Sequence, residues 1–155
     1  MPESLDDLLS RNDRGILFVG IGNVLRQDDG AGVYISRGIK NRRNISSLTV
    51  EVSIENYIGK INSLNPGILV LIDCVDFNSA PGTTRLLHVS QTEDLTFNTH
   101  NISLGKISEF FAMPVFILGI QPEKIDFGEN LSYIVKDQAD KIINLINRQE
   151  GLYGK

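Results

Sequence analysis

Residues 16–33 read ILFVGIGNVLRQDDGAGV and join an apolar run to a glycine-rich turn that carries two adjacent carboxylates, Asp28 and Asp29. The run Ile16–Ile21 is short, continuous and rich in aliphatic residues, and a glycine follows it directly. This pattern is typical of a strand buried on both faces. The segment Gly30–Arg43 then predicts a helix with a basic end. The opening unit is therefore strand, turn and helix, with both acids in the turn.

Strands and helices continue to alternate along the chain. Strands are expected at Leu48–Val52, at Ile68–Ile72 with Asp73 at its end, from Pro81 to Val89, and at Val115–Ile120; helices are expected at Ile58–Leu64, at Ile102–Phe111, and from about Ser132 to the end. Because the strands are continuously apolar, the fold class is α/β, a three-layer sandwich with a mostly parallel twisted sheet covered by helices on both faces. We interpret residues 1–155 as one domain, with the polar residues 1–14 a frayed N-terminal extension or a short helix.

Composition excludes several classes of protein. The hydrophobic fraction is 41%, the charged fraction 22% and the formal net charge −4, as in a globular chain without the basic surface of a nucleic-acid binder. The single cysteine, Cys74, allows no internal disulfide and fits a reducing compartment. The N-terminus lacks the apolar core of a signal peptide, and no run is long enough to span a membrane. We expect a cytoplasmic protein, monomeric in isolation, with no nucleic-acid or membrane partner.

Three candidate site residues fall where the carboxyl ends of parallel strands are expected to lie. Asp29 follows the first strand, Asp73 ends the third, and His100 lies in the loop NTHNIS. Ligands of open α/β sheets bind at this edge, and two carboxylates with one imidazole suit a divalent first-row metal. Each residue also has a structural interpretation. Either acid of the pair could cap the following helix, Asp73 could form a turn, and His100 could be an exposed loop residue.

Three other polar or reactive side chains receive structural interpretations. Cys74 follows Asp73 in a strand, so it faces the opposite side of the sheet and is expected in the core. Asp76 is expected to form a turn or to support the site from a second layer, and His88 to lie on the surface at a strand end.

Two known motifs match only in part. GIGNVL resembles the start of a dinucleotide-binding loop, but Leu25 stands where the third glycine is required. A phosphoacceptor receiver domain also uses an acidic pair and an aspartate at the end of the third strand, here Asp73. Its pair lies at the strand end itself, however, and a lysine precedes its proline, whereas here Gln121 precedes Pro122.

Four motifs in order resemble the nickel-iron hydrogenase maturation endopeptidase family: GIGNVLRQDDGAGV, LVLIDCVD, THNISL and FILGIQPE. The resemblance extends over residues 15–148. It implies a protease that removes a C-terminal extension from a hydrogenase large-subunit precursor after nickel insertion. The family's two acids and histidine correspond to Asp29, Asp73 and His100, which would be both the catalytic and the metal-contacting residues. Nickel would be carried by the precursor, with zinc or another divalent metal as a substitute.

One departure from the family pattern leaves alternatives open. Many members carry a D-G-G or A-G-T turn after the second strand, whereas VEVSIENYIGKI continues without it and is a few residues shorter. The first alternative to a metal-dependent endopeptidase is therefore a receiver-like or metal-recognising module that only binds. The second is a maturation chaperone that recognises the nickel site without cutting.

Overall fold

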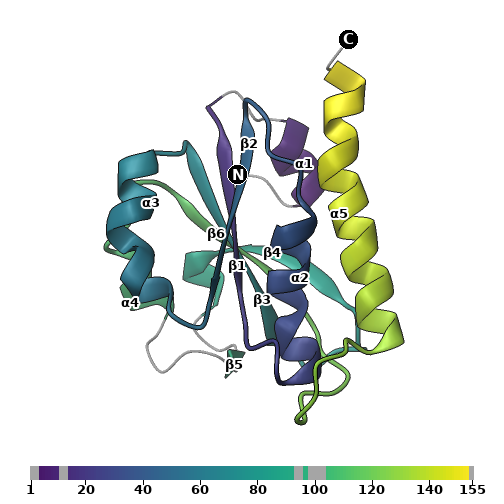
Figure 1. Cartoon of the computed structure of the whole chain (residues 1–155). Helices are drawn as coiled ribbons and strands as arrows, with labels where there is room; N and C mark the ends of the chain where they lie inside the picture. Colours follow the sequence, from purple (N-terminus) through teal and green to yellow (C-terminus); the bar gives the residue numbers. More distant parts are fainter. Residues whose placement is uncertain (1–3, 11–13, 93–95, 98–103, 154–155) are drawn as a thin grey trace.

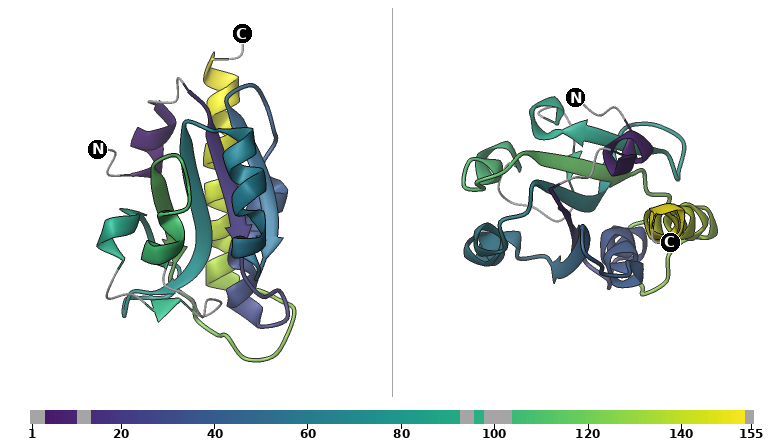
Figure 2. Two further views of the ribbon diagram at one scale, coloured as in Figure 1. Left: turned by 90° about the vertical axis from the view of Figure 1, so that its left-hand side faces the viewer. Right: turned by 90° about the horizontal axis from the view of Figure 1, so that it is seen from above.

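The computed structural model describes residues 4–10, 14–92, 96–97 and 104–153. It is an α/β sandwich, as the sequence predicts, with helices on both sides of a central sheet (Figure 1, Figure 2). In chain order the elements are α1 (Leu5–Ser10), β1 (Ile16–Ile21), η1 (Gln27–Gly30), α2 (Ala31–Gly38), β2 (Ile45–Glu51), η2 (Ile54–Tyr57), α3 (Ile58–Leu64), β3 (Ile68–Asp76), β4 (Thr84–His88), η3 (Val89–Gln91), β5 (Thr96–Phe97), α4 (Leu104–Ser108), β6 (Val115–Ile120) and α5 (Tyr133–Tyr153).

The sheet has the order β2-β1-β3-β6-β4, and β5 pairs with the end of β3. The four strands β2, β1, β3 and β6 are parallel, whereas β4 is antiparallel to β6 at one edge. The strands β1 and β6 are buried at every residue, which explains why their sequences are apolar without alternation. Parallel pairing of β1 with β3 places the carboxyl ends of both strands at the same edge.

Two apolar clusters cover the two faces of the sheet. On one face, side chains of α1, α2 and α5 pack against β1, β3 and β6, with Ile35 and Ile146 fully buried. On the other face, η2, α3 and α4 pack with Ile54 and Ile61 fully buried. The helix after β1 and the helix after β2 therefore lie on opposite faces. Such a reversal opens a crevice beyond the carboxyl ends of β1 and β3, where ligands of open α/β sheets bind.

The N-terminal segment differs from one of the two expectations. Residues 5–10 form helix α1, and Leu5, Leu8 and Leu9 are buried in the cluster that contains α5. A frayed extension is therefore wrong for Leu5–Ser10, and the short helix is confirmed. The physical reason is the apolar spacing of these leucines, which places them on one helix face.

The helix after the acidic pair is shorter than predicted. It ends at Gly38 because Ile39 adopts an extended conformation, so the three basic residues of the segment 40–43 lie beyond it. Asn147 of α5 closes this end of α2, since its amide donates to Gly38 O and its oxygen accepts from Lys40 N. Arg42 donates to the carbonyl of Ile146 at 2.7 Å instead of serving the end of α2.

Candidate active site

Asp29 reaches the edge of the sheet through a loop that folds back on β1. A Cβ at Gly22 would lie 2.0 Å from the carbonyl oxygen of Asp29, and the φ of Gly22 is +149°. Only glycine allows this close approach in that conformation. The backbone N–H of Asn23 donates to Asp29 Oδ2 at 3.2 Å, and the Asn23 side chain accepts from Leu25 N at 2.9 Å. The G-x-G-N start of the motif therefore shapes the turn that carries Asp29.

The expectation that Asp73 ends the third strand is wrong, because pairing with β6 and β5 carries β3 on to Asp76. Asp73 lies within β3, one residue beyond Ile72, the last residue of β3 that pairs with β1. It pairs with Gly119 of β6, and its Oδ1 accepts from the N–H of Cys74 at 2.8 Å. The first turn of α2 covers both strand ends, because a Cβ at Gly32 would lie 2.2 Å from Ile72 O and 2.5 Å from Ile21 O. Since η1 directly precedes α2 and contacts β3, the turn that carries Asp29 lies against β3.

The two predicted acids thus lie on segments that meet at one edge of the sheet, where η1 contacts β3. Asp29 and Asp73 are both 0% exposed. Burying a carboxylate costs free energy unless it is paired, and each of the two has interaction partners in the structure. Two carboxylate donors are part of the ligand set that a first-row metal accepts.

His100, the third predicted site residue, lies outside the described residues. Among the residues that are described, no group of three His, Cys, Asp or Glu side chains forms a metal site. The convergence of His100 with the two acids therefore stays a prediction.

Asp28 is not a helix cap in this structure. The N-cap of α2 is Gly30, which has no side chain that could cap the helix. The Asp28 carboxylate, 0% exposed, instead accepts hydrogen bonds from the loop 121–132, which connects β6 to α5. The capping role that the sequence allows for Asp28 is therefore wrong, and its carboxylate instead holds the loop 121–132.

The structural interpretations of the other candidates hold. Cys74 forms no disulfide and is 1% exposed on the buried strand β3. Asp76 forms a turn in which it accepts from Asn78 N at 2.8 Å, and this bond, with a second from Gln121 Nε2, holds the pKa of Asp76 below its ordinary value. His88 ends β4, where its ring accepts from Ser90 N and packs edge-on against Phe116.

Sequence reasoning missed the role of Gln121. Its side chain, 7% exposed, accepts from Phe77 N at 2.5 Å and donates to Asp76 at 3.1 Å. It therefore anchors the segment between β3 and β4 to the end of β6. The signal that could have indicated this role is the position of Gln121, directly after the buried strand β6. A long polar side chain at that position can bond to the neighbouring strand end instead of to solvent.

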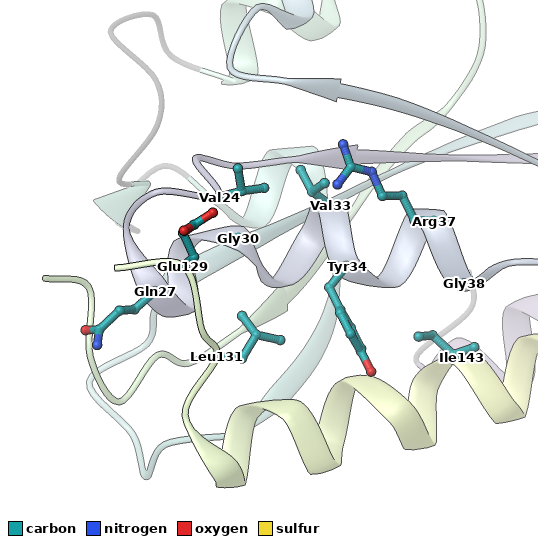
Figure 3. Close-up of a pocket in the computed structure, with 10 residues that line it drawn as sticks. All are labelled: Val24, Gln27, Gly30, Val33, Tyr34, Arg37, Gly38, Glu129, Leu131 and Ile143. Atoms are coloured by element: carbon teal, nitrogen blue, oxygen red, sulfur yellow. The ribbon is translucent and has the colours of Figure 1, made fainter. Parts of the chain in front are cut away.

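A pocket of about 510 Å³ also went unpredicted. It lies beside α2 and α5 (Figure 3), and neither Asp29 nor Asp73 lines it. Tyr34 points from α2 across to α5, where its hydroxyl donates to Asp140. The pocket therefore lies between α2 and α5, and Gln27 and Gly30 of η1 border it at one end.

Fold and site together define a class: an α/β protein with one buried acid on η1 and another on β3, where these two elements meet. The family model described as hydrogenase maturation protease matches residues 52–149, more than half of the 155-residue chain. The chain belongs to the hydrogenase maturation protease family. It is 27% identical to a putative hydrogenase maturation protease of Methanocaldococcus jannaschii, covering 94% of each chain.

Two further similarities support the same conclusion. The chain is 25% identical to the hydrogenase 3 maturation protease of Escherichia coli K12, over 84% of this chain and 88% of that one. It is also similar to the crystal structure of a [NiFe] hydrogenase maturation protease HycI from Thermococcus kodakarensis. That comparison has a TM-score of 0.81 and 26% identity, and it covers 94% of this chain and 97% of the other. The resemblance found in the four motifs is therefore confirmed, and with it the fold.

Proposed function

We propose that this protein removes the C-terminal extension of a nickel-loaded [NiFe] hydrogenase large-subunit precursor, in the cytoplasm and as a monomer. The observation that carries the proposal is the placement of Asp29 and Asp73, fully buried acids on separate segments, at the edge where ligands of such sheets bind. Membership of the hydrogenase maturation protease family supplies the reaction class. No helix among the described residues is long and apolar enough to cross a membrane.

The nickel belongs to the substrate in this proposal. Asp29 and Asp73 contact it with carboxylate oxygens, and His100 adds an imidazole nitrogen. Zinc or another divalent ion can substitute, because the donor set is not selective for nickel. The metal polarises the scissile carbonyl or lowers the pKa of a water molecule. Cys74 is buried on β3 and is not proposed as a nucleophile.

The shortened connection after the second strand affects which precursor is accepted. Only Val52 and Ser53 separate the end of β2 at Glu51 from η2. Ile54, the first residue of η2, is fully buried, so the missing turn leaves a short and anchored link. We propose that this link narrows the choice of hydrogenase and leaves the edge that carries Asp29 and Asp73 unchanged.

The test is the mass of a nickel-loaded precursor before and after incubation with the protein. We expect loss of a C-terminal peptide. Asp29→Asn, Asp73→Asn and His100→Ala should each abolish the cleavage. Asp76→Asn is the matched control, because this exposed turn residue lies three positions after Asp73 on the same strand. It should leave the rate within about twofold, as is usual for surface changes.

Two results would contradict the proposal. An intact precursor that nevertheless stays bound to the protein would identify a maturation chaperone. Full cleavage by the Asp29→Asn or Asp73→Asn protein would show that these acids are not the site.

A further inference from the structure

Asp28, the neighbour of the proposed site residue Asp29, is bonded to a distant part of the chain. Its Oδ2 accepts from Glu123 N at 2.8 Å, from Lys124 N at 2.9 Å and from Ser132 Oγ at 2.8 Å. Its Oδ1 accepts from Ser132 N at 2.7 Å. All four donors belong to the loop 121–132. A buried carboxylate with this many donors forms strong, charge-assisted hydrogen bonds.

Backbone hydrogen bonds also join the segment around η1 to the loop 121–132. Gln27 N donates to Gly128 O at 2.7 Å, and Gly128 N donates to Leu25 O at 2.8 Å. Asp28 N donates to Lys124 O at 3.0 Å. The segment around η1 and the loop 121–132 therefore form one bonded unit at the lower edge of the molecule in Figure 1, where α2 begins.

The turn is also held in a conformation that it would not adopt alone. Gln27 has a φ of +49°, in the left-handed region that non-glycine residues rarely occupy. Such a conformation persists only where the surroundings fix it. On one side the turn is fixed by Gly22 and Asn23, which contact Asp29. On the other side it is fixed by the loop 121–132.

We propose that Asp28 is a positioning residue: it locks the loop 121–132 onto η1 and thereby sets the place of Asp29 at the strand edge. The inference rests on the proposed function, since it assigns Asp28 a role in the same cleavage. The two adjacent acids thus have different roles. Asp29 faces the substrate's metal, and Asp28 fixes the backbone from which Asp29 projects. A displacement of about 1 Å in a reacting group can lower a rate about 100-fold.

Asp28→Asn is the decisive variant. The amide keeps one acceptor oxygen but places an N–H₂ group against at least one of the loop's donors. The bonds between residue 28 and the loop 121–132 are therefore weakened, although the side chain keeps its size. We expect kcat for the nickel-loaded precursor to fall about 10- to 100-fold, with KM within about twofold. Amide hydrogen exchange at Glu123, Lys124 and Ser132 should become faster in the same protein.

Asp140→Asn is the matched control. Asp140 also joins two elements, through its bond to Tyr34, but it lies on α5 away from the turn. This variant should keep kcat within about twofold at temperatures where it is folded. Ser132→Ala removes one of the four bonds to Asp28 and should lower kcat in the same direction by a smaller factor. It provides the test if Asp28→Asn does not fold.

The outcomes separate this inference from the function on which it rests. If the wild-type protein cuts the precursor and folded Asp28→Asn cuts it equally fast, Asp28 is only structural and the inference is wrong. Unchanged exchange of the loop amides in that variant would also overturn it. If the wild-type protein does not cut at all, the proposed function fails first and this inference fails with it.

Discussion

Gly32 and Gly59 lie at corresponding positions near the start of two helices, yet their surroundings differ completely. A Cβ at Gly32 would lie 2.2 Å and 2.5 Å from two backbone carbonyl oxygens, whereas a Cβ at Gly59 would meet nothing within 4 Å. We therefore expect Gly32→Ala to lower the free energy of unfolding by about 2–3 kcal/mol, because backbone must move to admit the methyl group. Gly59→Ala should raise it by about 0.5–1 kcal/mol through helix propensity.

Urea unfolding of the two variants measures both effects. The pair also tests how tightly α2 lies over the strand ends. If Gly32→Ala were as stable as the wild-type protein, α2 would not sit against the ends of β1 and β3, and the placement of Asp29 near Asp73 would lose its support.

At the same scale, the sequence predicted that Asp28 and Asp29 share one turn, but not which partners each carboxylate has. Helix capping was the role expected for Asp28, because its actual partners lie 95 to 104 residues further along the chain. No local pattern specifies a bond at such separation. The burial of Gln121 was missed for the same reason, since its partners are Asp76, the last residue of β3, and Phe77, which follows it.

At the scale of the elements, the first prediction concerns helix α1 and whether it stabilises the fold as part of the core. Leu8 is 0% exposed and packs in the cluster that contains α5. Leu8→Ala should lower the free energy of unfolding by about 2–4 kcal/mol, the usual cost of removing a fully buried leucine side chain. Ser10→Ala, at the exposed end of the same helix, is the control and should change it by less than about 0.5 kcal/mol. Equal stability of the Leu8 and Ser10 variants would mean that α1 does not dock.

The contact between α2 and α5 predicts a dependence of stability on pH. The Tyr34 hydroxyl donates to Asp140, which lowers the pKa of that carboxyl; the same bond raises the pKa of Tyr34. A lowered carboxyl pKa stabilises the fold above the ordinary value of about 3.9, and this contribution is lost as the pH falls through the folded pKa. A raised tyrosine pKa stabilises the fold below about pH 10 and is lost as the pH rises through the folded value.

Asp140→Asn should therefore flatten the stability curve at both ends of the pH range, as urea unfolding at a series of pH values would show. Asp137→Asn is the control, because Asp137 pairs with Lys141 one turn away on α5 and, within the part of the chain that the structure describes, joins no second element. If the two variants gave the same curve, the bond between Tyr34 and Asp140 would not contribute to the packing of α2 on α5.

Element boundaries show where local patterns stop being informative. The strands β1, β3 and β6 were predicted because a strand that is buried on both faces has an uninterrupted apolar sequence. The end of α2 was predicted about five residues too late, because it is set by Asn147 of α5 and by the extended Ile39. The pairing of β5 with β3 was not predicted, since two residues carry no periodicity. A strand was predicted at the position of β4, but its antiparallel direction depends on its partner β6.

For the whole molecule, the open question with the sharpest experimental answer is where the metal resides. The proposed donor set of Asp29, Asp73 and His100 leaves coordination positions for the substrate, as metal sites that must accept a ligand do. A protease that held its own metal tightly could not distinguish a loaded precursor from an empty one. The protein should therefore be purified largely free of metal, bind added nickel or zinc weakly, and cut only the nickel-loaded precursor.

Elemental analysis and paired cleavage reactions test this expectation together. A chelator applied to the protein and then removed should leave its activity on loaded precursor unchanged, because no resident ion is lost. Removing nickel from the precursor before mixing should abolish cleavage, and reloading it should restore cleavage. Asp76→Asn again controls for general effects of changing an acid near the strand end. Stoichiometric metal that survives chelation, together with equal cleavage of loaded and empty precursor, would show that the metal belongs to the enzyme and that the precursor's nickel is not what Asp29 and Asp73 recognise.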